Sequence, residues 1–314
     1  MMTRSECTAW LLSHDNYCIL THGRPDGDTL GSASALCLGL RQLGKTAYIL
    51  ENPGTTPYLG RCILGLTKTA PEIGDTLVSV DVASPQMLPI IHRDYADRVQ
   101  LRIDHHASAT PFTELELVEP ETAACGEIIY ELLMEMGVEL TKEMAWRLYI
   151  ALSTDTGCFR YANTTAHTYL VAGACAATGA ELYPITQELF DTNSLSKLRL
   201  QSYIVENARF LMGGRAAVCA IPKEMEKTVT REDMEGIPGF LRSMEGVKIS
   251  ATIRISPEGC KLSVRAVPGY DATEVCRKFG GGGHKGAAGA TLNMTLEEAT
   301  EAAIRALTEL MEDL

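Results

Sequence analysis

Short apolar runs alternate with helical patterns through the first half of the chain. Four of the runs predict buried β-strands because they are rich in apolar and β-branched residues; they are residues 17–21, 46–50, 76–80 and 99–103. Apolar residues recur at helical spacing in three longer segments, residues 30–44, 126–137 and 142–155. Alternation of strands and helices predicts an α/β domain with a parallel sheet flanked by helices.

The pattern changes near residue 191. Residues 191–212 form a mixed polar segment with Ser and Asn near its start, which is typical of a connecting helix. Four later runs predict strands, and a turn at residues 257–259 joins two of them; the runs are residues 215–221, 247–256, 260–267 and 286–294. Residues 295–314 predict an amphipathic helix. We therefore expect a first domain at 1–190, a connecting helix or linker at 191–212, and a smaller domain at 213–314.

The length of the chain is consistent with this division, and its composition excludes several classes of function. A chain of 314 residues is longer than one ordinary core supports. The formal net charge of −12 argues against a protein that coats long nucleic acid, because that task needs many cations. No apolar stretch reaches the roughly 20 residues that a membrane span needs, and the first residues lack a secretion signal, so we expect a cytoplasmic protein. The ten cysteines contain no Cys-x-x-Cys pair, which disfavours a zinc ribbon or a disulfide framework.

Side chains that bind metal ions follow three of the predicted strands. His22, Asp26 and Asp28 come after the first strand, Asp81 follows the third, and residues 104–106 (Asp-His-His) follow the fourth. The carboxyl ends of parallel strands share one edge of a sheet, so these seven side chains are expected to converge there. Crowded carboxylates raise one another's pKa values and are costly to desolvate, and divalent cations would relieve both effects.

The residue types at this edge favour two first-row metal ions. Carboxylates mixed with histidines suit manganese or a related metal, and the set is too large for one ion. Each motif alone is more often an ordinary turn or a solvated loop than a metal site. Their coincidence at three strand ends is what favours a metal site. His14, His92 and His167 lack this setting and are interpreted as structural or surface residues.

Four motifs resemble those of a known family. "HGRPDGDTLGS" at residues 22–32, "DHH" at 104–106 and "STDTGCF" at 153–159 resemble the motifs of the DHH phosphoesterase superfamily. "GGGGHKGAAG" at residues 280–289 resembles the substrate-binding motif of the DHHA1 domain that accompanies it. The nearest subgroup is that of the bifunctional oligoribonucleases and 3′-phosphoadenosine-5′-phosphate (pAp) phosphatases. The resemblance implies an N-terminal DHH domain with a mainly parallel sheet and a smaller C-terminal α/β DHHA1 domain with a mixed sheet.

The resemblance also implies roles for individual residues of the first domain. His22 and Asp26 would hold one manganese ion, and Asp28 and His105 the other. Asp81 and Asp155 would bridge the ions or complete their coordination. Asp104 would orient a neighbouring histidine. His106 would lie near the scissile phosphate and neutralise charge that develops there.

In the second domain, the resemblance assigns Arg265 to a terminal phosphate of the substrate and places Gly282, Gly283 and His284 in the substrate-binding motif. Consecutive glycines also let backbone amides approach a phosphate closely, although a flexible linker has the same composition. Ala109 stands where family members often have asparagine, so one hydrogen bond near the site is not expected here.

Together these features predict a two-metal phosphoesterase. We expect manganese, with cobalt or magnesium as substitutes, and short RNA, linear dinucleotides or pAp as substrates. A homodimer and the absence of membrane contacts are further expectations. A cyclic-dinucleotide phosphodiesterase and a nucleotide-binding regulator without turnover stay as alternatives. The glycine-rich motif disfavours a pyrophosphatase.

Overall fold

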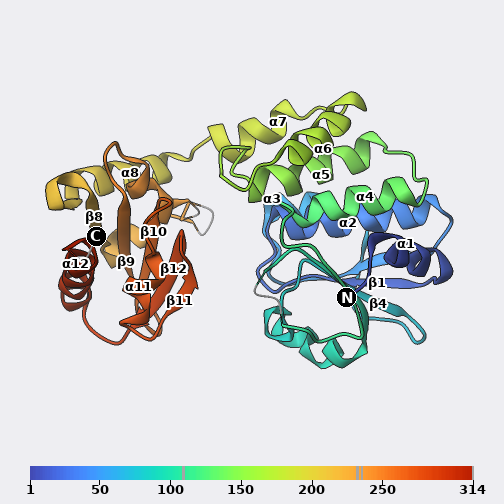
Figure 1. Ribbon diagram of the computed structural model, residues 1–314, viewed down its shortest axis with the longest axis horizontal. Helices are drawn as coiled ribbons and strands as arrows, with labels where there is room; N and C mark the ends of the chain where they lie inside the picture. Colours follow the sequence, from blue (N-terminus) through green and yellow to red (C-terminus); the bar gives the residue numbers. More distant parts are fainter. Residues whose placement is uncertain (108–109, 231–232, 235, 313–314) are drawn as a thin grey trace. The chain divides into compact units, whose positions relative to one another are not determined.

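The computed structural model describes residues 1–107, 110–230, 233–234 and 236–312. Ala109 lies outside the described residues. The chain divides into two compact units, Met1–Asp191 and Thr192–Leu314 (Figure 1). In the described ranges, no helix combines the length and the apolar character that crossing a membrane requires.

The first unit is built on a sheet of six parallel strands in the order β3-β2-β1-β4-β5-β6. The strands are β1 (Tyr17–Leu20), β2 (Ala47–Leu50), β3 (Thr67–Lys68), β4 (Thr76–Val80), β5 (Val99–Asp104) and β6 (Leu115–Val118). The four predicted strands and their parallel arrangement are confirmed. The edge strands β3 and β6 are too short or too polar for their sequence pattern to predict them.

Helices cover the first sheet and bury both of its faces. They are α1 (Arg4–Ser13), α2 (Gly27–Gln42), α3 (Pro57–Gly60), α4 (Cys125–Glu135), α5 (Lys142–Asp155), α6 (Ala166–Ala177) and α7 (Tyr183–Thr186), with the shorter η1 (Arg61–Ile63), η2 (Pro85–Met87), η3 (Ile90–Arg98) and η4 (Gln187–Asp191). In β1, Tyr17 and Ile19 join the core with α2, α4 and α5, while Cys18 and Leu20 join a second core with Leu88. Burial on both faces explains why β1 is apolar at every position.

Glycines bring α2 unusually close to α5. A Cβ atom on Gly31 would lie 2.4 Å from the carbonyl oxygen of Arg147, and one on Gly27 would lie 2.4 Å from Cγ2 of Thr154. These two contacts show that the start of α2 lies beside the end of α5. The antiparallel packing therefore brings Asp28, in the first turn of α2, to the same end as Asp155, the last residue of α5.

The second unit contains a mixed sheet in the order β11-β12-β10-β9-β8-β7, in which β8 and β9 are parallel and the other neighbours antiparallel. The strands are β7 (Arg209–Leu211), β8 (Ala216–Ile221), β9 (Ile249–Ser256), β10 (Gly259–Ala266), β11 (Gly282–His284) and β12 (Ala287–Leu292). The helices are α8 (Leu195–Asn207), η5 (Met212–Gly214), α9 (Lys223–Glu226), α10 (Ile237–Phe240), η6 (Leu241–Ser243), α11 (Ala272–Arg277) and α12 (Leu296–Glu312). The expected mixed sheet is confirmed.

The segment expected to be a connecting helix at 191–212 differs in the structure. Helix α8 ends at Asn207, and Arg209–Leu211 forms strand β7, which pairs with β8. Leu200 and Ile204 of α8 are fully buried against Ala217 and Ile221 of β8. These contacts place α8 in the second unit, where its apolar side completes a core rather than spanning a linker.

Candidate metal centre

The first part of the site lies where the sheet order reverses. Strand β1 has β2 on one side and β4 on the other, and in open parallel sheets ligands bind at the carboxyl ends of such strands. The loop after β1 carries His22 and Asp26. Asp26 is the N-cap of α2, where its Oδ1 accepts a hydrogen bond from the backbone N–H of Thr29 at 3.0 Å. Asp28 follows in the first turn and is fully buried.

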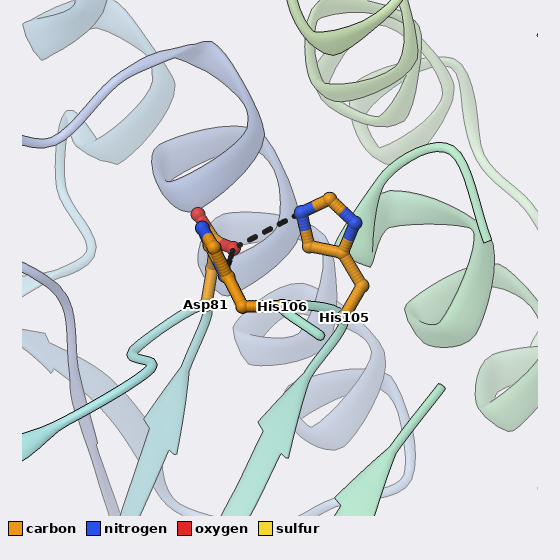
Figure 2. Close-up of side chains that lie close together, drawn as sticks. All are labelled: Asp81, His105 and His106. Carbon is orange, nitrogen blue, oxygen red and sulfur yellow. Dashed lines mark ion pairs between the residues drawn. The ribbon is translucent and has the colours of Figure 1, made fainter. Parts of the chain in front are cut away.

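Asp81 occupies the central position of the site. It directly follows β4 with a φ of 60°, a left-handed conformation that is uncommon for a non-glycine residue, although Asp adopts it more readily than most. Its Oδ2 accepts a hydrogen bond from Oγ1 of Thr29 at 2.6 Å and lies 3.7 Å from Nε2 of His22. Its Oδ1 lies 3.6 Å from Nε2 of His105 and 3.5 Å from Nδ1 of His106, and Figure 2 shows both rings directed toward it.

Three overlapping groups have the spacing that a metal ion needs. They are His22, Asp26 and Asp81; Asp28, His105 and Asp155; and Asp81, His105 and His106. The six residues predicted as ligands are therefore all brought together, although they come from four separate places in the chain. Asp81 belongs to the group of His22 and to that of His105, whereas Asp155 lies in one group, with its Oδ2 3.3 Å from Nε2 of His105.

Burial and the closeness of the carboxylates to one another determine the electrostatics of the site. Burial, with the charge of Asp155, raises the pKa of Asp28 to about 7. Burial, with the charges of Asp28 and Asp26, also raises the pKa of Asp81 to about 7. Burial raises the pKa of Asp155 to about 6. Burial alone would lower the pKa of His105, but its hydrogen bond to Asp155 and the nearby carboxylates raise it to about 10.

The side chains present fit a divalent metal. Asp81 Oδ1 is buried and accepts no hydrogen bond from any described residue, although unsatisfied buried oxygens are rare. A cation would satisfy this oxygen and remove the repulsion between the carboxylates. The donors are carboxylate oxygens and imidazole nitrogens, a set that suits manganese and related metals.

The backbone of α4 holds Asp28 in place. Asp28 accepts hydrogen bonds from the N–H groups of Cys125 at 2.6 Å and Gly126 at 2.9 Å, and from Ser32 Oγ at 2.8 Å. The N-cap of α4, Ala124, has no side chain able to cap the helix. Asp28 therefore caps a helix that lies nearly 100 positions further along the chain. Sequence reasoning missed this role because only the tertiary fold brings the two segments together.

Asp104 binds both neighbouring histidines. Its Oδ1 accepts hydrogen bonds from the backbone N–H of His105 and from Nδ1 of His106, each at 2.8 Å. Burial alone would raise the pKa of Asp104, but the hydrogen bonds from His106 and the charge of Arg102 lower it. Asp104 therefore stays ionised and orients the His106 ring. The side chain of His106 is 31% exposed, against 2% for Asp81, so His106 is the more accessible to a substrate.

Arg102 stabilises the two loops that carry Asp81, His105 and His106, and the sequence analysis did not identify it. Its side chain is almost completely buried. Nη1 donates to the carbonyl oxygens of Ala83 and Thr110, each at 3.1 Å, and Nη2 donates to Oε2 of Glu116 at 3.0 Å. Arg102 thus connects the loop after β4, which begins with Asp81, to the loop after β5, which carries His105 and His106. The signal in the sequence is a charged residue between the buried apolar residues Leu101 and Ile103.

The predicted substrate residues of the second unit lie in and beside a pocket of about 380 Å³. Arg265 on β10 and Gly282 on β11 line this pocket. Gly283 and His284 follow on β11 and are exposed, but they are not among the lining residues. Gly283 has a φ of 143°, and a Cβ atom there would lie 2.6 Å from the carbonyl oxygen of Ala287, so this position of β11 requires glycine.

Comparisons with known proteins agree with this division of the chain. The family model described as "DHH family, N-terminal domain" matches residues 16–152, and that described as "DHHA1 domain" matches residues 213–313. The bifunctional oligoribonuclease and PAP phosphatase NrnA of Thermus thermophilus is 34% identical over 297 residues, which cover 93% of this chain and 89% of the relative.

Solved structures share the fold. An exopolyphosphatase-related protein from Bacteroides fragilis superimposes with a TM-score of 0.83 at 25% identity, covering 98% of this chain and 95% of that protein. RecJ from Thermus thermophilus in complex with Mn²⁺ gives a TM-score of 0.55 at 14% identity, covering 97% of this chain and 55% of that protein.

Proposed function

This chain belongs to the DHH phosphoesterase family and is a hydrolase acting on phosphoester bonds, and from this premise we propose a narrower activity. The proposed enzyme is a manganese-dependent phosphodiesterase that converts short oligoribonucleotides or linear dinucleotides to mononucleotides, with dephosphorylation of pAp as a related activity. The observation that carries this proposal is Asp81, a buried carboxylate with one oxygen toward His22 and the other toward His105.

We assign His22 and Asp26 to one ion and Asp28 and His105 to a second, with Asp81 shared and Asp155 completing the second site. Manganese is favoured by the mixture of carboxylates and imidazoles, and RecJ, which shares the fold, was crystallised with Mn²⁺. Cobalt and magnesium are possible substitutes. When bound, such ions lower the pKa of a water molecule and neutralise phosphoryl oxygens.

The chain's own side chains would act on the phosphate as well. In the proposed mechanism His106, oriented by Asp104, donates a hydrogen bond to the phosphoryl group and stabilises charge that develops there. Arg265, with its planar guanidinium, binds a second phosphate of the substrate. Gly282, Gly283 and His284 offer backbone amides and an imidazole beside it. The NrnA relative supports short RNA and pAp as the substrates.

The test is a comparison of three substrates in one assay with manganese. A 5′-phosphorylated linear dinucleotide, pAp and a cyclic dinucleotide are offered to the wild-type protein and to Asp81→Asn. The linear dinucleotide should have the highest kcat/KM, and Asp81→Asn should lower it at least about a hundredfold while Thr29 keeps a hydrogen-bond acceptor. Preference for the cyclic substrate, or turnover of none, would refute the proposal in favour of a cyclic-dinucleotide enzyme or a binding protein.

A further inference from the structure

The pocket of the second unit contains more positive charge than Arg265 supplies. Alternation along β9 and β10 sends Ile253, Leu262 and Val264 into the core that contains α12. The intervening positions line the pocket, and these include Arg254 and Lys261 as well as Arg265. The described lining contains no acidic side chain, in a protein whose net charge is −12. A pocket with this lining attracts anions.

Arg254 and Lys261 are placed directly opposite each other. They are paired in the antiparallel register of β9 and β10. Side chains at such positions lie close enough to bind one anionic group together. Glu226 interacts electrostatically with Arg254 but does not line the pocket.

The spacing separates this pair from Arg265. Lys261 lies four residues before Arg265 on β10, which corresponds to about 13 Å between their Cα atoms. Two separate anionic groups therefore suit the pocket better than one. Its volume of about 380 Å³ is that of a small-ligand site, and Ile221, Ile237 and Pro238 provide an apolar wall suited to a sugar or base. The lining thus matches part of a nucleotide rather than an inorganic anion.

We propose that Arg254 and Lys261 form a second phosphate-binding position, beyond the phosphate held by Arg265. The preferred substrates of this enzyme then carry one more phosphate in their non-reacting part than a 5′-monophosphorylated dinucleotide does. This inference rests on the proposed function of the chain. The additional phosphate has two possible sources, the next nucleotide of a longer oligonucleotide or the outer phosphates of a 5′-triphosphate.

The experiment uses the full chain with manganese and three substrates. The reference is a 5′-monophosphorylated dinucleotide, and the extended substrates are a 5′-monophosphorylated trinucleotide and a 5′-triphosphorylated dinucleotide. KM and kcat for the first cleavage are measured for the wild type, Lys261→Gln and Arg254→Gln. Lys227→Gln, which removes an exposed charge outside the pocket, is the matched control.

Both pocket variants should raise KM for one extended substrate at least about tenfold more than for the reference, because a charged hydrogen bond to phosphate is lost. The control variant should show no such difference. Selectivity for the trinucleotide identifies a neighbouring nucleotide as the source, and selectivity for the triphosphate identifies terminal phosphates. Equal changes for all three substrates, or no change, would overturn the inference.

A measurement of nucleotide affinity tests this inference independently of the proposed function. If the wild type hydrolyses none of the substrates, the proposed function fails. The affinity of the same three nucleotides for Asp81→Asn, and for Asp81→Asn combined with Lys261→Gln, is then measured by calorimetry. A selective loss of affinity for an extended nucleotide would still support the second phosphate position, and an equal or absent loss would refute it.

Discussion

Metal binding should release protons, and their number follows from the pKa values of the ligand side chains in the metal-free protein. Near pH 7, Asp28 and Asp81, with pKa values of about 7, each hold about half a proton, and His105, with a pKa of about 10, holds about one. Asp155, with a pKa of about 6, adds about a tenth. Burial alone would lower the pKa of His22, but its hydrogen bond to Asp26 and the charge of Asp81 raise it, so His22 adds a further part of a proton. A metal ion needs these ligands deprotonated, so loading both sites at pH 7 should release at least about two protons.

The number of protons released should decrease as the pH rises. At pH 8.5 the carboxyl groups are already ionised, and the release should fall below its value at pH 7, with His105 supplying about one proton. Isothermal titration calorimetry of manganese into the metal-free protein, in buffers that differ in ionisation enthalpy, measures the number directly. Asp155→Asn, which keeps the shape of a ligand whose carboxyl group is mostly ionised at pH 7, serves as a comparison.

A release close to zero at pH 7, or one that rises between pH 7 and 8.5, would refute the reasoning. Either result would mean that the carboxylates share their charge with groups other than His105. It would also remove the argument that the buried cluster requires a cation.

Two further predictions concern the framework of the first unit. Gly31→Ala should destabilise the protein by about 1–3 kcal/mol in urea denaturation, because the added methyl group meets a backbone oxygen of α5. The control is Gly173→Ala on α6, where the methyl group enters open space and should stabilise the protein by up to about 1 kcal/mol. Equal effects of the two substitutions would contradict the close packing of α2 and α5. Arg102→Met should lower the free energy of unfolding by about 3–5 kcal/mol, because Glu116 is left buried and uncompensated, and it should also weaken manganese binding. Combining Arg102→Met with Glu116→Gln should restore part of the free energy of unfolding. No recovery in the double variant would show that the loss of the ion pair is not the cause.

Much of the first unit could be predicted because its signals are local. The buried strands are continuous apolar runs, and the rule that parallel strands end at one edge brings His22, Asp81 and His105 together without any knowledge of the loops. Asp155 could not be found this way, since it ends a helix, and its place depends on how closely glycines let α2 approach α5. It was expected only through the family resemblance.

Other features depend on contacts that no local pattern encodes. Arg102 contradicts the apolar pattern of β5, and its three partners come from loops and a strand whose positions only the fold determines. The pairing of Arg254 with Lys261 depends on the register of β9 and β10. A shift of one residue in that register would separate the charges, so the sequence alone does not indicate a second phosphate position.

The double use of Asp28 affects how sequence variation at the site should be interpreted. Its carboxylate faces the proposed ion and also satisfies the first amides of α4, so a substitution there removes a structural support together with a ligand. Asp155 is the last residue of α5, and among the described contacts its side chain caps no helix. In a survey of random variants, changes at position 28 would therefore reduce the amount of protein that accumulates in cells, whereas changes at position 155 would leave abundant but inactive protein. Loss of abundance and loss of activity would thus distinguish two residues that are proposed to bind the same ion.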